Sequence, residues 1–591
     1  MRPGSVRRLS WAVFFATLAV LAMVLPVYWV YLLTTVAISA ILARGVGVVT
    51  NQAGLLLLCQ MSFAALGGWV VSWIALQWAT APFVLLVVIG GVAVAPVGWL
   101  LGFMTSRIRG VEFAVVTLGF AAALDLVLKQ GSFPGVGSGT PVVIAAPFNE
   151  PLWFFALSWA LLLALQLLVT RLGRSRVGLA WPMLRQSERA AAALGVRVSL
   201  AKASALSIAA GMAAVAGGLL AGQYGLLTPQ VFSPLTSLVV LATAVLTGAS
   251  LLSGAILAGV FAVFVPEVLR RVGVPIDVGN ALLALGAVDV LRRGIGGIAE
   301  QLHAKVQDRS FRGQRVTCEL VGSAVAGSAF AGLGGAGASV AGSPVATIEQ
   351  TSRKLFAQPR FEVRDLSVMV GERRLLDGVS VQVQSATVHA LVGANGAGKT
   401  TLIDAVSGFL PRAEGQVWLN GQRVDGLSVD RRARLGLRRS FQRSRVPQNL
   451  TVGEYLRLAS GGSGADAMRE ASEHFGLPLG QVPIRLLDST SRRLLEIAGT
   501  VAALPSVVLL DEPASGCSEA ERPLLAERLR QVPDRFGCAV LMVEHDMYLV
   551  REVAEMTTVL NDGRVIASGA TAAVLQDPAV VAAYLGRKES S

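Results

Sequence analysis

Long apolar runs separated by short polar stretches fill roughly the first 300 residues of the chain. A helix that crosses the hydrocarbon core of a membrane needs about 17–25 mostly apolar residues. Several runs are short or rich in glycine, so we predict about eight to ten spans. The glycine pairs at 67–68, 90–91 and 217–218 should let neighbouring helices approach closely. Runs of spanning length lie near residues 11–30, 31–48, 54–77, 82–104, 111–129, 152–171, 203–224, 235–251, 252–270 and 276–291.

Basic residues beside these runs indicate the orientation. The segment 171–202 holds six arginines and one lysine but a single acid, Glu188. Loops rich in Lys and Arg stay on the cytoplasmic side, so we expect this segment and the N-terminus inside. The run from Trp11 to Val30 is long for a signal-peptide core and indicates a retained first span. Arg270 and Arg271 would face outward in a ten-span count, which leaves the last spans open.

The pattern changes twice after the last apolar run. Residues 321–344 are almost entirely Gly, Ala, Ser and Val, which predicts a flexible linker. Beyond it, β-rich runs alternate with polar helical stretches, as in a soluble α/β domain. We therefore predict an α-helical polytopic membrane domain at 1–302, a Gly/Ala-rich linker at 303–358 and an α/β domain at 359–591.

Composition agrees with a membrane protein. Hydrophobic residues make up 53% of the chain and charged residues only 15%, below the ~25% of soluble domains. The net charge of +13 fits arginine-rich cytoplasmic loops better than nucleic-acid binding, because the basic residues cluster beside the spans without interleaved aromatics. The four cysteines show neither metal nor disulfide spacing.

Residues 393–400 read Gly-Ala-Asn-Gly-Ala-Gly-Lys-Thr, which fits the phosphate loop G-x-x-x-x-G-K-[ST]. Such a loop turns backbone N–H groups around a polyphosphate, while Lys399 supplies a charge and the Thr400 hydroxyl ligates Mg²⁺. The apolar run 388–392 predicts a strand before it, and a helix from Lys399 would add its N–H groups. The expected ATP-binding residues are Gly393, Ala394, Asn395, Gly396, Ala397, Gly398, Lys399, Thr400 and Thr401.

A second motif follows the apolar run 507–510, which ends in Asp511 and Glu512. Asp511 suits Mg²⁺, and Glu512 suits a base that polarises the attacking water. His545 follows the apolar run 539–543, where a contact with the γ-phosphate would make it catalytic together with Glu512. Gln442 lies between the two motifs and is expected to bind ATP and sense Mg²⁺, so the metal set is Thr400, Gln442 and Asp511.

These residues resemble an ABC-transporter ATPase across about 360–588, close to the ATPase subunit of branched-chain amino acid importers. The resemblance rests on the stretches at 407–409, 440–442, 510–514 and 544–547 and on the tail at 577–586. The N-terminal part looks like the matching permease, with cues at 53–55, 107–110 and 117–120. By resemblance, a loop that couples the permease to the ATPase contains Arg185, Glu188, Ala190, Ala191, Leu194 and Gly195.

The chain departs from the family pattern at three places. The aromatic residue that stacks on adenine aligns with Val370, and the Asp or Asn after the acidic strand aligns with Ser518. The glycine of the signature loop becomes Thr490 and its serine becomes Asp488, whose charge should repel a phosphate. The degenerate signature comprises Leu487, Asp488, Ser489, Thr490 and Ser491.

The resemblance implies the fused permease and ATPase subunit of an ATP-driven importer for branched-chain amino acids or a similar small solute. It would be a multi-pass protein of the plasma membrane with a cytoplasmic ATPase, using ATP and Mg²⁺, with one competent and one degenerate ATP site. Its partners would be a second permease, a second ATPase and an extracytoplasmic solute-binding protein, and no nucleic acid. An exporter half-transporter and a non-transporting, ATP-binding regulator remain as alternatives.

Overall fold

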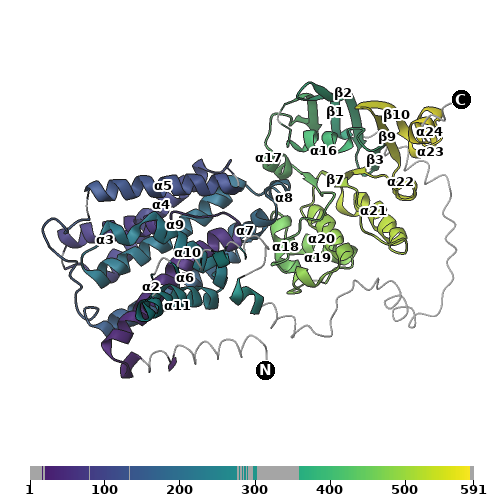
Figure 1. Ribbon diagram of the computed structural model, residues 1–591. Helices are drawn as coiled ribbons and strands as arrows, with labels where there is room; N and C mark the ends of the chain where they lie inside the picture. Colours follow the sequence, from purple (N-terminus) through teal and green to yellow (C-terminus); the bar gives the residue numbers. More distant parts are fainter. Residues whose placement is uncertain are drawn as a thin grey trace, which may run out of the picture. The chain divides into compact units, whose positions relative to one another are not determined.

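In the computed structural model the chain separates into two compact units (Figure 1). The membrane unit comprises Met1–Arg185 and Val198–Arg312, and the second unit comprises Gln186–Arg197 and Gly313–Ser591. The predicted linker at 303–358 lies outside the described residues. The structure describes residues 16, 17, 20, 22–302 and 359–585, apart from positions 79, 109, 132, 411 and 479 and many positions between 274 and 296.

Nine α-helices of the described part carry most of the membrane unit, with a π-helical segment at Val48–Gln52. Six helical spans are long and apolar enough to cross a membrane: Val27–Gln52, Phe83–Met104, Gly110–Gly131, Pro151–Gly173, Val198–Tyr224 and Leu252–Val272. The helices are α2 (Val27–Gly47), α3 (Gln60–Gln77), α4 (Phe83–Met104), α5 (Gly110–Gly131), α6 (Pro151–Gly173), α7 (Arg176–Gln186), α9 (Val198–Tyr224), α10 (Pro234–Thr247) and α11 (Leu252–Val272).

Eight of the ten predicted runs overlap one of these helices over most of their length. The predicted boundary between residues 30 and 31 is wrong, because α2 begins after Pro26 and runs through it. The run at 54–77 becomes helical only at Gln60, and α10, with 14 residues, is shorter than a full span. Most of the predicted span at 11–30 and much of that at 276–291 lie outside the described residues.

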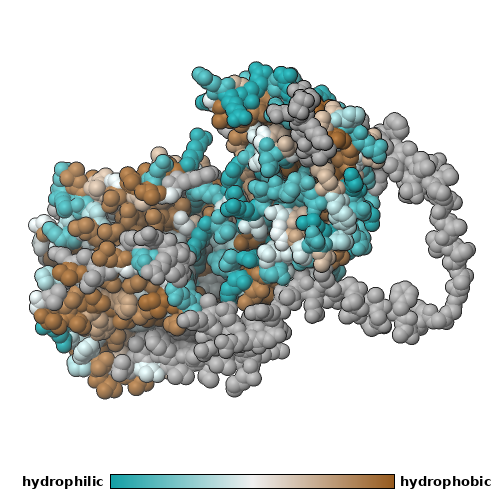
Figure 2. Space-filling view, turned by 45° about the vertical axis from the view of Figure 1, so that its right-hand side comes forward, coloured by the Kyte–Doolittle hydropathy of each residue, from teal (hydrophilic) through white to brown (hydrophobic). Residues whose placement is uncertain are grey.

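Helix α9 packs against α3 and α4 through small residues. A methyl group on Gly217 of α9 would lie 1.8 Å from the carbonyl oxygen of Ala64 in α3, and one on Gly67 would lie 2.3 Å from the backbone of Ala214. The expected close approach is therefore confirmed at these two glycines. Hydrophobic side chains dominate the visible face of the membrane unit, as lipid contact requires, whereas polar side chains dominate that of the second unit (Figure 2).

The second unit is built on two sheets. A six-stranded sheet has the order β10-β9-β3-β8-β7-β6, with only β10 antiparallel, and a four-stranded antiparallel sheet has the order β2-β1-β4-β5. The strands are β1 (Pro359–Val370), β2 (Arg373–Gln384), β3 (Val388–Gly393), β4 (Ala413–Leu419), β5 (Gln422–Arg423), β6 (Leu437–Arg439), β7 (Val507–Asp511), β8 (Ala539–Val543), β9 (Met556–Asn561) and β10 (Arg564–Ala570).

Three predicted strands are confirmed as β3, β7 and β8, which are neighbours in the larger sheet. Because parallel strands end at the same edge, the motifs that follow them meet there. The helices are α8 (Glu188–Ala193), α16 (Lys399–Ser407), α17 (Val429–Arg434), α18 (Val452–Ala459), α19 (Ala465–His474), α20 (Ser489–Val501), α21 (Arg522–Phe536), α22 (Met547–Val553), α23 (Thr571–Val574) and α24 (Pro578–Leu585).

Acid should destabilise this sheet through His389, which is buried in β3 with its Nε2 2.8 Å from Thr558 Oγ1. Burial lowers the pKa of His389 to about 4. In the unfolded chain this histidine binds a proton near pH 6.5, whereas in the folded protein it stays neutral until about pH 4. The free energy of unfolding therefore decreases as the pH falls from about 6.5 towards 4. Replacing His389 by glutamine should remove about 2 kcal/mol of the stability difference between pH 7 and pH 5. Urea titrations of the full chain in detergent, followed by circular dichroism, would measure this, and an unchanged pH dependence would contradict it.

Candidate nucleotide site

The phosphate loop joins β3 to α16 at the carboxyl edge of the larger sheet. Gly398 has φ +101°, and a methyl group there would lie 2.8 Å from a Leu376 methyl carbon, so the turn into the helix favours glycine. The Lys399 ammonium donates to the carbonyl oxygens of Gly393, at 2.7 Å, and Ala394, at 2.9 Å. Burial lowers the pKa of Lys399, while Glu512 and Asp511 oppose that shift. The ammonium is thus held over the loop, where it can meet phosphate oxygens.

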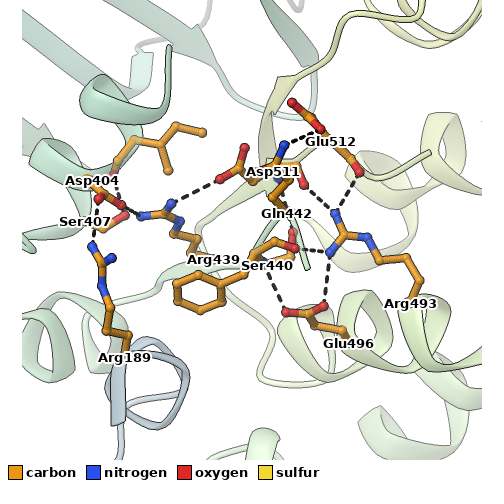
Figure 3. Close-up of polar contacts among 12 residues, drawn as sticks. Arg189, Asp404, Ser407, Arg439, Ser440, Gln442, Arg493, Glu496, Asp511 and Glu512 are labelled. Carbon is orange, nitrogen blue, oxygen red and sulfur yellow. Dashed lines mark hydrogen bonds and ion pairs between the residues drawn. The ribbon is translucent and has the colours of Figure 1, made fainter. Parts of the chain in front are cut away.

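Strand β7 ends beside this loop in two carboxylates with different surroundings. Asp511 is buried, and burial raises its pKa against the opposing influence of Arg439. Glu512 has a positive φ of +49°, which is costly for a residue with a side chain and occurs preferentially at functional sites. The Gln442 Nε2 donates to Glu512 Oε2 at 2.8 Å (Figure 3). The structure therefore brings together two residues that are 70 positions apart in the sequence.

His545 lies at the end of the neighbouring strand β8. Its Nδ1 is 4.0 Å from Glu512 Oε1, and its side chain is 63% exposed, so the imidazole is accessible from solvent. Glu544 is buried behind it and accepts from the backbone N–H groups of Ala514, His545 and Asp546 at 2.9, 3.0 and 3.2 Å. Burial raises the pKa of Glu544. Glu544 thus fixes the loop that presents the histidine.

The donor chemistry fits a magnesium nucleotide. Among the described residues no three His, Cys, Asp or Glu side chains group closely enough to hold a metal ion by themselves. Mg²⁺ prefers oxygen ligands and is commonly held by one or two carboxylates together with substrate phosphates. Asp511 and Thr400 supply a carboxylate and a hydroxyl, and Gln442, which donates through Nε2, has its amide oxygen to offer. These residues would hold the ion when phosphates complete its shell.

Two residues that support the site, Arg493 and Glu496, belong to no motif predicted from the sequence. Arg493, on the buried side of α20, donates to the carbonyl oxygens of Phe441 and Asp511, to that of Glu512 at 2.8 Å and to Glu496 Oε2 at 3.1 Å. Glu496 Oε1 accepts from the backbone N–H of Phe441 at 3.1 Å, and burial raises its pKa to about 7 despite Arg493. Figure 3 shows this pair below Gln442, Asp511 and Glu512. Two charged residues at i and i+3 on the apolar side of an otherwise amphipathic helix were the available signal.

Residues 487–491, which are expected from the sequence to be a degenerate signature, lie at the start of α20. Asp488 is the N-cap residue, and its Oδ1 accepts from the Ser491 N–H at 2.6 Å. Thr490 Oγ1 lies 3.4 Å from Glu521 Oε2, which also accepts from Ser518 Oγ at 2.8 Å. One backbone N–H of the first turn of α20 is therefore bonded to a carboxylate of its own chain, and the Glu521 carboxylate lies beside Thr490.

The residues expected in the coupling loop divide between the units. Arg185 belongs to the membrane unit, where its guanidinium donates to the Asn51 carbonyl oxygen. Glu188, Ala190, Ala191, Leu194 and Gly195 belong to the second unit. There the Ser187 hydroxyl caps α8 and accepts from Arg445 at 2.8 Å, and the Gly195 carbonyl oxygen accepts from Arg434 at 3.1 Å. Arginines from two further segments thus hold both ends of α8.

Three family models match the chain. Residues 28–287 match a branched-chain amino acid transport system permease component. Residues 376–515 match the ABC transporter model, and residues 564–590 match that of the branched-chain amino acid ATP-binding cassette transporter.

Curated relatives match the second unit. The high-affinity branched-chain amino acid transport ATP-binding protein BraF of Pseudomonas aeruginosa is 31% identical over 252 residues, which are 39% of this chain and 99% of BraF. LivG of Escherichia coli (strain K12), described in the same words, is 30% identical over 254 residues, 39% of this chain and 99% of LivG. The zinc import ATP-binding protein ZnuC of Alkalilimnicola ehrlichii is 32% identical over 232 residues, 38% of this chain and 84% of ZnuC. A solved nucleotide-free ATP-binding cassette from an ABC transporter aligns with 39% of this chain and 100% of its own, at 24% identity and a TM-score of 0.35.

Proposed function

We propose a direction, a solute class and a partner set for this chain, which belongs to the branched-chain amino acid family of ABC transporters and joins a permease and an ATPase in one polypeptide. It would work as an importer of a branched-chain amino acid or a similar small solute. A second permease, a second ATPase and an extracytoplasmic solute-binding protein would complete the assembly. The two family models on either side of residue 300 support this proposal most directly.

In the proposed reaction the chain's own residues divide the work. The backbone N–H groups of residues 393–401 and the Lys399 ammonium bind the phosphates of ATP. Thr400, Gln442 and Asp511 would hold Mg²⁺, which would supply positive charge against the phosphate oxygens. Glu512 takes the proton of the attacking water, and His545 contacts the γ-phosphate. Closing of the two ATPases on ATP would then be passed to the permease through the segment 185–195.

Uptake by reconstituted vesicles tests the direction and the solute. With ATP enclosed and the binding protein outside, labelled leucine should accumulate inside, and Glu512→Gln should abolish that accumulation. Accumulation only when ATP and the ATPase face the outside, with solute moving away from them, would identify an exporter. Unchanged uptake in the Glu512→Gln variant would favour the regulator, because another ATPase would then supply the energy.

We further propose that only one of the two ATP sites in the assembly is competent. Each nucleotide would lie between one phosphate loop and the signature of the other ATPase. This chain offers its partner an N-terminus of α20 that Asp488 already occupies, and a carboxylate there should repel the phosphate of a partner-bound nucleotide. Its own phosphate loop, completed by the partner's signature, would be the competent site.

Repair of the signature should restore the second site. The double replacement Asp488→Ser and Thr490→Gly keeps a capping hydroxyl, removes the charge and opens space for a phosphate. Vanadate trapping of the complete assembly should then label both sites instead of one. Asp466→Ser is a matched control, because it removes an acid of α19 that is 97% exposed. Equal labelling of both sites before any replacement would contradict the proposal.

A further inference from the structure

Four charged side chains of alternating sign form a continuous line in the second unit (Figure 3). Arg189 of α8 donates through Nη2 to Asp404 Oδ2 at 2.7 Å. The other oxygen of Asp404, on α16, accepts from Arg439 Nη1. Arg439, at the end of β6, donates through Nη2 to Asp511 Oδ2 at 3.1 Å. The line therefore runs from the segment between the permease helices α7 and α9 to the carboxylate proposed to hold Mg²⁺.

Its inner half lies away from water. The side chains of Arg439 and Asp511 are each 4% exposed, whereas that of Arg189 is 38% exposed. Two rings shield the line: the Phe409 centroid is 4.4 Å from the Arg189 guanidinium and 5.6 Å from that of Arg439, and the Phe441 centroid is 4.9 Å from Arg439. Charges in such surroundings are little screened and act on one another over several ångströms.

We propose that Arg439 is a positioning residue for Asp511, and that Asp404 shares its charge between Arg439 and Arg189 so that the metal site and α8 bias each other. This rests on the proposed role of Asp511. Mg²⁺ and Arg439 compete for the same carboxylate. When the ion binds Asp511, the ion pair between Arg439 and Asp404 becomes stronger. The ion pair between Asp404 and Arg189 then becomes weaker. Such a coupling is reciprocal, so a change at Arg189 must alter the affinity for Mg²⁺.

The alternation of signs predicts opposite effects at successive positions. Without the Arg189 charge, Asp404 pairs with Arg439 only. The ion pair between Arg439 and Asp511 then weakens, which should strengthen Mg²⁺ binding. Without the Asp404 charge, Arg439 pairs with Asp511 only, which should weaken Mg²⁺ binding. A purely structural role would move both in the same direction. The double variant should behave as the Asp404 variant does, because in the proposed coupling the Arg189 charge reaches Arg439 through Asp404.

The test measures the Mg²⁺ concentration that gives half-maximal binding of trinitrophenyl-ATP to the full chain in detergent. Arg189→Gln should lower that midpoint, Asp404→Asn should raise it, each by about threefold or more, and the double variant should match Asp404→Asn. Arg434→Gln is the control, because Arg434 contacts the same loop at Gly195 but not Asp404. Hydrogen exchange of residues 188–194 supplies a second reading: it should rise when Mg²⁺ joins the bound probe, and this rise should vanish in Asp404→Asn.

The coupling would be overturned if the Arg189 and Asp404 variants moved the Mg²⁺ midpoint in the same direction, or if their effects added in the double variant. A midpoint shift of equal size in Arg434→Gln would also overturn it. If Asp404→Asn fails to fold, the more exposed Arg189→Gln decides alone, since an unchanged or raised midpoint refutes the proposal. A wild-type chain that binds no probe would instead refute the nucleotide site itself.

Discussion

Replacing Glu512 by glutamine is expected to lower the rate of ATP hydrolysis by about 10²–10⁴-fold, which is the usual contribution of a general base. Glutamine has nearly the same shape and keeps an amide oxygen for the contact with Gln442 Nε2, now 2.8 Å from Glu512 Oε2. It cannot take a proton from water. Phosphate release by the complete assembly measures the rate, and binding of trinitrophenyl-ATP should persist because the phosphate loop is untouched.

Glu519→Gln is the matched control for this replacement. Glu519 is an exposed carboxylate seven residues further on, so its loss should leave hydrolysis within about twofold. Hydrolysis that survived in Glu512→Gln at a similar level would remove Glu512 from the chemistry. The positive φ of +49° at position 512 would then need another explanation.

Replacing Arg493 by methionine should cost about 3–5 kcal/mol of local stability, the range seen when one partner of a buried ion pair is removed. The change leaves Glu496 without its cation and removes the donor to three backbone carbonyl groups, those of Phe441, Asp511 and Glu512. These segments carry Gln442 and both acidic residues, so nucleotide-dependent activity should fall with stability. Hydrogen exchange of α20 and β7 in the full chain would report the loss segment by segment.

Arg492→Met separates this effect from a general one. Arg492 is the neighbouring arginine of the same helix, and its guanidinium lies on the exposed side, 3.2 Å from the Asp488 carbonyl oxygen. Its loss should change the free energy of local opening of α20, measured by hydrogen exchange, by less than about 0.5 kcal/mol. Equal protection of α20 in the Arg492 and Arg493 variants would show that Arg493 does not organise the site.

The local motifs of the second unit were accessible from the sequence because their chemistry is contiguous. The phosphate loop needs glycines, a lysine and a hydroxyl within eight neighbouring positions, and apolar runs before it and before Asp511 mark the strands. The membrane helices were accessible for a similar reason, since apolar length is the main requirement of a bilayer. Their boundaries were less so: α2 passes through residue 30 because both sides of that position are equally apolar.

The sequence by itself determined that this protein joins a bundle of apolar helices to a phosphate-binding α/β domain, because each of those features depends on neighbouring residues. Only the tertiary structure decided that Arg493 holds the backbone of Phe441, Asp511 and Glu512 together, that Asp488 caps its own helix and that Asp404 lies between Arg189 and Arg439. In the sequence of the second unit, a charged residue that faces water cannot be distinguished from one that faces a buried partner. The fold makes the difference, because it removes water from Arg439 and Asp511 and leaves them only each other and their neighbours to balance their charge.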